Sequence, residues 1–426
     1  MPASASWTSR AHDVLLIGFL LLTFVGTHPF AGVDVAARED GNLLDRIAVL
    51  SLFGLAAYVL WSNLGAALDV FIRNGPFWLV VAMCLASIFW STHPDLTLRR
   101  AMLLVFLTTI AMAIAAGAKD ARRMHTMMFV TLAAIMMVNL ASVVVAPSLA
   151  ISPIGVQGMY TQKNVAGSVA MITLIVGITW IFGAESVRSK ILGAAVLALI
   201  AFFLVITRSR TSINLTVLGI AVCLFCAMCE RYRSPFILLS VALGSILVVA
   251  LMGWLAAYDF DFSAAMASIV SDTSFSGRDE LWAFTLNDAE KRPWLGYGYG
   301  AYWDVGLADD PLVRAEPGSW LASVAIGVIN QAHHGYLELW LHIGLPAMIF
   351  AALIIAWGAL SGGAKAVFGA SDRGVRALVG GMAAILGLHL LHNLTEATLF
   401  MRGTPFFNFA TLAVFLISRS RFLEAR

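Results

Sequence analysis

Long apolar stretches separated by short polar connections recur along nearly the whole chain. A helix needs about 20 residues to cross a hydrocarbon layer of roughly 30 Å. The pattern therefore predicts an all-α polytopic membrane protein with about twelve transmembrane helices. We place them at residues 14–31, 44–62, 76–91, 98–116, 124–146, 165–183, 191–207, 212–229, 235–257, 335–360, 375–395 and 402–418.

One connection is much longer than the others. Residues 258–334 carry much of the Asp, Glu, Trp, Tyr and Gly of the chain, and connections of this length are often lids or binding elements. We therefore divide the chain into three parts. They are an N-terminal transmembrane bundle of about nine helices (1–257), one large outer loop (258–334) and about three C-terminal transmembrane helices (335–426).

The long loop contains two recognisable patterns. In "SGRDELWAFTLNDAEKRP", apolar residues recur with a helical period, Ser276 is a suitable N-cap with Asp279 three residues on, and Pro293 ends the run. This predicts an amphipathic helix at the membrane interface. The following "WLGYGYGAYW" interleaves glycines with aromatic residues but lacks the flanking strand and helix of a nucleotide site. It predicts a tight turn whose aromatic side chains face sugars or lipid headgroups at the membrane surface.

Composition supports the membrane assignment. Hydrophobic residues make up 60% of the 426 residues and charged residues only 12%, and the mean hydropathy is +0.85. A formal net charge of +2 indicates no nucleic-acid partner. Arg10 precedes the first apolar run, as in a secretory signal, but no small-residue cleavage site closes that run, so we interpret it as the first transmembrane helix.

The distribution of Lys and Arg predicts the orientation. Alternate connections are rich in basic residues, including the cluster Lys119, Arg122 and Arg123, which indicates cytoplasmic N- and C-termini. Some cations nevertheless fall on the outer side, against this rule, and an anionic ligand on that face would explain them. They are Arg99, Arg100, Lys163, Arg208, Arg210, Arg278, Lys291, Arg292, Arg314 and Arg402.

Four stretches between residues 155 and 346 resemble the motifs of one family. They are "GMYTQKNVAGSVA", "TRSRTS", "SGRDELW…RPWLGYGYGAYW" and "AHHGYLELWLHIGLP". Together they resemble the O-antigen ligase and polysaccharide polymerase superfamily, glycosyltransferases of the bacterial inner membrane. The resemblance implies a GT-C-like architecture and a substrate glycan linked to undecaprenyl diphosphate. In the last motif, His333 occupies the family's histidine position, and His334 stands where asparagine is usual.

The same residues suit the chemistry of glycan transfer. A departing diphosphate needs a fixed positive charge, which guanidinium supplies with bidentate geometry, and we assign this role to Arg210 and Arg278. The acceptor hydroxyl needs a general base, and imidazole suits that role at neutral pH. We assign it to His333, with His334 as the alternative. Further substrate-binding candidates are Lys163, Asn164, Arg208 and Tyr336.

Each of these residues also has a structural interpretation. Arg208 and Arg210 are placed to extend to lipid headgroups as interface anchors. Arg278 can pair with Asp279 or Glu280 within the amphipathic helix. One of the two histidines is expected to be a hydrogen-bonding group at the interface.

Metal chemistry is the less favoured alternative. The spacing of His389, His392 and Glu396 predicts one helical face with a zinc-type ligand set, but "HLLHNLTEA" lacks the glutamate that directly follows the first histidine of a zinc protease. We expect this polar face to line the interior of the protein. The stripe of Cys223, Cys226 and Cys229 has no fourth cysteine nearby and predicts packing rather than a cluster.

Two classes of function remain open. The first is a glycosyltransferase without metal or cofactor, either an exopolysaccharide polymerase or a ligase that transfers O-antigen to lipid A-core. Its partners would be the lipid-linked donor, a glycan or lipid A-core acceptor, the bilayer, and flippase, chain-length or export proteins. The second is a polytopic transporter or flippase. Transporters often contain two related halves, whereas here one large loop lies off-centre and no repeat is visible, which favours the enzyme.

Overall fold

The computed structural model describes residues 3–30, 43–228, 278–369 and 372–419, and most of them are helical. The longer helices are α1 (Ala3–Phe24), α3 (Leu43–Ser62), α6 (Pro94–Gly117), α7 (Ala121–Val145), α9 (Lys163–Gly183), α10 (Val187–Thr207), Arg210–Met228, α16 (Leu345–Phe368), α17 (Arg373–His392) and α18 (Pro405–Arg419). The shorter elements are α4 (Leu64–Arg73), α5 (Gly75–Ala86), η1 (Ser87–Phe89), α8 (Pro147–Ala150), β1 (Ile151–Ser152), β2 (Gly155–Val156), α13 (Arg278–Lys291), η2 (Pro311–Arg314), α14 (Trp320–Ser323) and α15 (Gly335–Ile343).

Eight of the described helices are long and apolar enough to cross a membrane. A ninth span results if α4 and α5–η1, which meet at 79°, count as one broken crossing. The chain is therefore a multi-pass membrane protein. The number of about twelve spans stays a prediction: the predicted span 235–257 lies outside the described residues, and the span at 402–418 corresponds to α18, which has only 15 residues.

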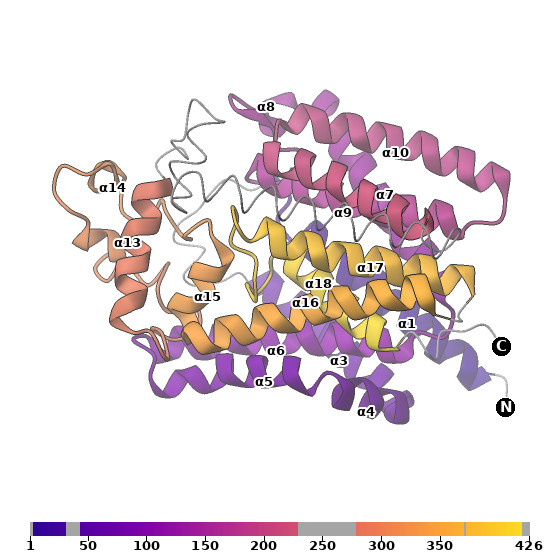
Figure 1. Cartoon of the computed structure of the whole chain (residues 1–426), viewed down its shortest axis with the longest axis horizontal. Coiled ribbons are helices and arrows are strands. Elements are labelled where there is room, and N and C mark those ends of the chain that lie inside the picture. The colour runs from indigo at the N-terminus through magenta and orange to yellow at the C-terminus, as the bar shows by residue number, and fades with distance from the viewer. Residues whose placement is uncertain (1–2, 31–42, 229–277, 370–371, 420–426) are drawn as a thin grey trace, which may run out of the picture.

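The long helices form an elongated bundle (Figure 1). Helices α16, α17 and α18 lie in its middle, where α17 contacts α9 on one side and α18 contacts α6 on the other. Polar N-caps begin several helices: the Asp120 side chain accepts from the first backbone N–H groups of α7, and Asp372 does the same for α17. Large apolar side chains, many of them Phe, fill the space between the helices.

Helices α13, α14 and α15 gather at one end of the bundle, which we call the site end (Figure 1). The start of α1 and the end of α18 lie at the other end, which we call the opposite end. There His12 of α1 contacts the Ile114 carbonyl, and Ile417 of α18 accepts from Lys365 at the end of α16. A separate small apolar cluster, which includes Leu281 and Trp303, forms the core of the site end. The division into three units stays a prediction.

The predicted continuous helix at 335–360 is wrong in one respect, because Gly344 breaks it into α15 and α16. Gly344 has a φ of 87°, and a Cβ at this position would lie 2.0 Å from the Trp294 carbonyl oxygen. Only glycine fits such a left-handed, close-packed position. The neighbouring Leu345 donates its N–H to the Pro293 carbonyl at 2.8 Å. The break therefore seats the turn that follows residue 291 against the start of α16.

A helix is present at the predicted place as α13 (Arg278–Lys291), and its position at the membrane interface stays a prediction. Its predicted N-cap, Ser276, lies outside the described residues. The prediction that the aromatic turn faces the surface is mostly wrong. Trp294 is exposed, but Tyr299, Tyr302 and Trp303 are buried. Gly298, at a φ of 104°, lets the backbone approach Ser91 so closely that a Cβ would lie 2.3 Å from its hydroxyl oxygen. The turn packs inward because its glycines permit this contact.

Arg100 of α6 fastens the glycine-rich turn to the bundle. Its guanidinium donates to the backbone carbonyls of Gly300, Trp303 (2.8 Å) and Asp304 (2.7 Å). The side chain is nearly inaccessible to solvent. A buried guanidinium is tolerated only where its donors are satisfied, so the turn and the helix stabilise each other.

Candidate functional site

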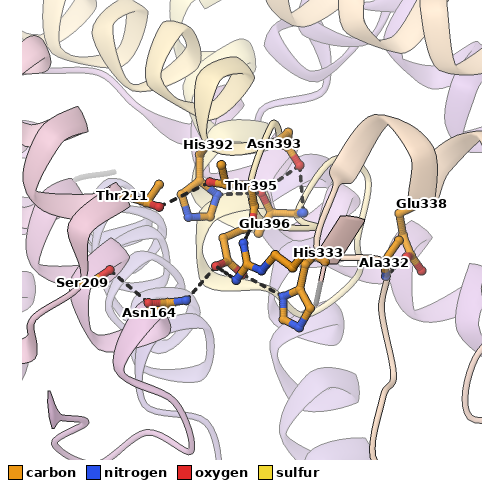
Figure 2. Close-up of polar contacts among 12 residues, drawn as sticks. Asn164, Ser209, Thr211, Ala332, His333, Glu338, His392, Asn393, Thr395 and Glu396 are labelled. Carbon is orange, nitrogen blue, oxygen red and sulfur yellow. Dashed lines mark hydrogen bonds and ion pairs between the residues drawn. The ribbon is translucent and has the colours of Figure 1, made fainter. Parts of the chain in front are cut away.

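The Glu396 carboxylate lies at the centre of a polar cluster at the site end (Figure 2). It accepts from the Asn164 amide at 2.7 Å and from an Arg278 Nη2 at 3.2 Å, both at Oε1. Its other oxygen, Oε2, lies 3.3 Å from Nδ1 of His333. The Glu396 side chain is only 8% exposed. One buried carboxylate thus joins residues from three distant stretches, the starts of α9 and α13 and the segment before α15. We call these four residues the Glu396 cluster.

The loop that carries Glu396 is folded by Asn393, which ends α17. Its side-chain oxygen accepts from the backbone N–H groups of Thr398 (2.8 Å) and Leu399 (2.7 Å). Its backbone carbonyl accepts from Gly335 at 2.8 Å. Because a Cβ at Gly335 would collide with the Asn393 side chain, glycine is required at this contact. Asn393 therefore fixes the Glu396 loop and also ties it to the histidine segment.

His333 adopts a left-handed backbone conformation with a φ of 50°. This conformation is unfavourable for a residue with a Cβ and persists only where neighbours enforce it. Ala332, just before it, donates its N–H to Oε2 of the buried Glu338 at 2.7 Å (Figure 2). Gly335, just after the histidine pair, is held by Asn393. The backbone is thus pinned on both sides of His333, and this directs the imidazole to Glu396.

His334 has a different task. Its Nδ1 accepts the N–H of Leu337 at 3.2 Å, which makes it the N-cap of α15. Its ring packs edge-on against Trp282, with 5.4 Å between ring centroids. Burial lowers the pKa of His334 below its ordinary value. The geometry therefore distinguishes the two histidines: His334 begins a helix, and His333 contacts the carboxylate.

Glu396 is held in its ionised form. Burial raises the pKa of this carboxyl, but the interactions of Glu396 with His333 and then with Arg278 outweigh burial, so the pKa lies below its ordinary value. A carboxylate can only accept hydrogen bonds, so Nδ1 of His333 carries the hydrogen of this pair. The opposite ring nitrogen, Nε2, is then the atom that can take up a proton.

Arg278 is directed to the cluster and not to its own helix neighbours. Besides Glu396, it donates to the Thr395 carbonyl at 2.6 Å. Glu280, one of the partners expected from sequence, instead accepts from the backbone N–H of Trp320 at 3.2 Å. Only two of the five N–H donors of Arg278 are used by these bonds, and its side chain is 23% exposed.

The motif 207–212 lies beside the cluster without supplying a charge to it. The Ser209 hydroxyl donates to the Asn164 side-chain oxygen at 3.2 Å, and the Thr211 hydroxyl lies 3.4 Å from that of Thr395. Arg210 is exposed and makes no hydrogen bond or ion pair within the described ranges. Arg208 is exposed in a left-handed conformation that ends α10.

The two remaining predicted residues contact the backbone. Nζ of Lys163 donates to the Ile154 carbonyl at 3.1 Å and lies 3.5 Å from the Arg208 carbonyl. The hydroxyl of Tyr336 donates to the Leu390 carbonyl at 2.8 Å and thereby links α15 to α17. The structure thus brings Asn164, Arg278 and His333 together, whereas the side chains of Lys163 and Tyr336 lie outside the cluster.

The predicted helical face of His389, His392 and Glu396 is wrong, because α17 ends at His392. His389 and His392 pack against Phe406, at 4.8 and 4.9 Å between ring centroids, while Glu396 turns to His333. In the part of the chain that the structure describes, no three His, Cys, Asp or Glu side chains are arranged to hold a metal. The sequence drew attention to Glu396 only through its spacing to these histidines. Its contacts with Asn164, Arg278 and His333 were therefore not predicted.

Comparisons with known proteins agree with the motifs. Residues 193–352 match a family described as O-antigen ligase, and this range includes Arg210, Arg278 and His333 but not Asn164 or Glu396. Over 276 residues the chain is 24% identical to the exopolysaccharide production protein ExoQ of Rhizobium meliloti (strain 1021). The aligned region covers 63% of this chain and 60% of that relative. The match thus spans less than two thirds of the relative. These findings confirm the resemblance predicted from the motifs: residues 193–352 of this multi-pass membrane protein are similar to the O-antigen ligase family.

Proposed function

We propose that the protein is a glycosyltransferase that moves a glycan from undecaprenyl diphosphate to a hydroxyl of a second glycan. In this proposal it polymerises exopolysaccharide repeat units at the periplasmic face of the bacterial inner membrane, without metal or cofactor. The observation that carries the proposal is the meeting of His333, Arg278 and Asn164 on Glu396. A base, a cation and an orienting carboxylate from separate stretches of the chain are the groups that such a transfer needs.

His333 acts as the general base. The oxygen of the acceptor hydroxyl attacks the anomeric carbon of the donor glycan and forms the new glycosidic bond, while its proton passes to Nε2 of His333. Glu396 accepts a hydrogen bond from Nδ1–H of His333 and so fixes the orientation and the tautomer of the imidazole ring. Glu396 is therefore a positioning residue and His333 the catalytic one.

Arginine side chains bind the departing diphosphate. As the bond between the anomeric carbon and the phosphate oxygen breaks, the lipid diphosphate leaves with the electron pair and gains negative charge. Arg278 has further N–H donors for these oxygens, and the exposed Arg210 can reach a ligand without breaking an existing bond within the described residues. Removing a donor aimed at transition-state charge typically costs about 10²–10³ in rate.

The choice of polymerase over ligase rests on the related protein, whose name assigns it to exopolysaccharide production. Transfer to lipid A-core is the alternative, in keeping with the description of the matched family. The two reactions share the donor and differ in the acceptor. The products therefore distinguish them better than the cluster does.

A comparison of the two histidines tests the proposal. In a deletion strain, we expect His333→Ala to abolish long polysaccharide chains on a gel, because the base is lost. His334→Asn is the matched control, since asparagine also caps helices well, and it should keep the ladder. The protein level in the membrane is measured for each variant.

Other outcomes would redirect the assignment. If long chains persist with His333→Ala at normal protein levels, the catalytic proposal is wrong and a transporter becomes the better hypothesis. If wild-type protein yields glycan attached to lipid A-core and His333→Ala abolishes that product, the protein is a ligase.

A further inference from the structure

A cleft runs beside α13 at the site end, and none of the residues that line it belongs to the Glu396 cluster. It has a volume of about 320 Å³. The same helix begins with Arg278, and Asp288 follows ten residues later, so a helical rise of 1.5 Å per residue separates them by about 15 Å. Polar residues that line the cleft include Glu280, Asn287, Asp288, Lys291, Arg314 and Ser319.

Two cations of the cleft are held in place by one buried carboxylate. Asp288 is 3% exposed and binds Nζ of Lys291 at 2.6 Å and a guanidinium nitrogen of Arg314 at 2.6 Å. The Tyr302 hydroxyl also donates to it, at 2.8 Å. Lys291 and Arg314 are more than half exposed, at 58% and 54%, and each has N–H donors beyond those that Asp288 uses. The cleft therefore presents fixed donors.

Acceptors and an aromatic ring complete the lining. Glu280 accepts from the backbone N–H groups of Trp320 and Leu321 and so holds α14 at the rim. Asn287 presents an exposed amide, which both donates and accepts, and Phe284 presents a partly exposed ring. The lining of the cleft thus combines the apolar face of an aromatic ring with polar groups that can orient a ligand.

The lining discriminates among ligand classes. An inorganic anion would meet the carboxylates of Glu280, Asp288 and Glu316 next to the cations, and this repulsion opposes its binding. An apolar ligand would remove paired charges from water without replacing their hydrogen bonds. A sugar residue offers hydroxyl donors and acceptors around the ring together with an apolar face, so it suits both parts of the lining.

We propose that the α13 cleft is a glycan-binding subsite that holds a sugar residue of a chain whose reacting end lies at the Glu396 cluster. This rests on the proposed glycosyltransferase function. The shared chemistry is a hydroxyl-rich oligosaccharide, and its source is either the acceptor chain or the glycan of the lipid-linked donor. Because α13 connects the two sites as one rigid helix, a chain bound in the cleft is positioned relative to His333.

Binding without turnover is the first test. The probe is the oligosaccharide released by mild acid from the producing strain's own polysaccharide, titrated calorimetrically into the purified protein. Ala283 is exposed and lines the cleft, so Ala283→Trp fills it. We expect the dissociation constant to rise by about tenfold or more. The matched control is Leu286→Trp on the same helix, because Leu286 is exposed and does not line the cleft. It should bind like wild type.

The milder Asn287→Ala, which removes hydrogen-bonding groups without adding bulk, should also weaken binding. A loss of binding in Asn287→Ala cannot be attributed to the bulk of an introduced tryptophan. Unchanged binding in both Ala283→Trp and Asn287→Ala, or equal loss in Leu286→Trp, would refute the subsite.

Kinetics then identify the source of the glycan. In an assay with lipid-linked donor and free acceptor oligosaccharide, a raised KM for acceptor in Asn287→Ala assigns the cleft to the acceptor chain. A raised KM for donor assigns it to the donor glycan. If neither KM changes, the cleft has no part in the reaction and the proposal fails.

The two proposals fail separately. His333→Ala should stop transfer and still bind the oligosaccharide. If His333→Ala transfers normally while Ala283→Trp weakens binding, the catalytic proposal is wrong and the glycan-binding cleft stands. If His333→Ala is inactive and both Ala283→Trp and Asn287→Ala bind normally, the cleft proposal alone is wrong.

Discussion

The two ends of the helical bundle use the same charged residue types in different ways. At the opposite end, Arg122 pairs with Glu185 and Asp372, and Arg123 pairs with Asp13. These pairs are open to solvent: Glu185 is 76% exposed and Arg123 57%. Ion pairs of this kind join helix ends and contribute little stability.

At the site end, the Glu396 carboxylate, only 8% exposed, serves three partners at once. Charge interactions strengthen where water is excluded, and a buried charge left without a partner is costly. The difference indicates that exposure, and not residue type, separates groups that hold helices together from groups arranged for chemistry.

Among the tests of this comparison, Glu396→Gln is expected to have the largest effect. The amide keeps the size of the side chain but loses the charge that orients His333, so we expect kcat to fall by about 10²–10⁴-fold. Glu185→Gln makes the same change at the opposite end and should leave kcat unchanged. The measurement is the initial rate of glycan transfer by purified protein at equal folded concentration. Equal rates for the two variants would contradict the comparison.

Arg278→Gln is expected to change the pH dependence of stability. The pKa of Glu396 is lower in the folded protein than its ordinary value, so ionised Glu396 contributes stability at neutral pH that is lost as the pH falls through the folded pKa. Without Arg278, that pKa rises toward its unfolded value, so the loss becomes smaller and is complete at a higher pH. The check is the Tm of the purified protein from neutral to acidic pH. Arg123→Gln serves as the control, and an acid-induced loss of Tm in Arg278→Gln as large as that of wild type would argue against the charge coupling.

His334→Ala should act on stability through the helix cap. The lost bond from the Leu337 N–H to the His334 ring predicts a decrease of about 0.5–2 kcal/mol in the free energy of unfolding. His334→Asn retains a capping group and should recover most of this decrease. Chemical denaturation in detergent measures both variants, and equal loss in the two would assign the effect to the contact with Trp282 instead.

The smallest effect is expected at the opposite end. Arg123→Ala removes an exposed pair with Asp13, which predicts a loss of about 0.2–1 kcal/mol in the free energy of unfolding and no change in transfer rate. The same denaturation and rate assays apply. A large fall in rate would show that the two ends are coupled, contrary to the comparison.

The sequence predicts the helices better than their interruptions. Apolar runs reveal helices such as α6 and α9 because hydropathy reports the solvent around a segment. The break at Gly344 depends instead on a contact with the Trp294 carbonyl, which no local pattern encodes. The inward packing of Tyr299 likewise depends on distant partners such as the Phe400 carbonyl, its hydrogen-bond acceptor.

Only part of the site was predicted, because local patterns identify motifs but not contacts between distant residues. Arg278, His333 and Asn164 stand in recognisable motifs, and these three meet in the structure. Glu396 lies 63 residues from His333 and 118 from Arg278 and has no motif of its own. Its importance arises from the tertiary fold of one loop, which sequence spacing could not disclose.

Arg100 holds the glycine-rich turn, and this affects how the long connection at 258–334 can be produced in the laboratory. Three backbone carbonyls of that turn accept hydrogen bonds from a helix that crosses the membrane. A soluble fragment cut at the edges of this connection would lose these donors together with the buried contact at Ser91. Crystallisation, antibody selection and inhibitor screening against this region therefore call for the intact chain in detergent or lipid.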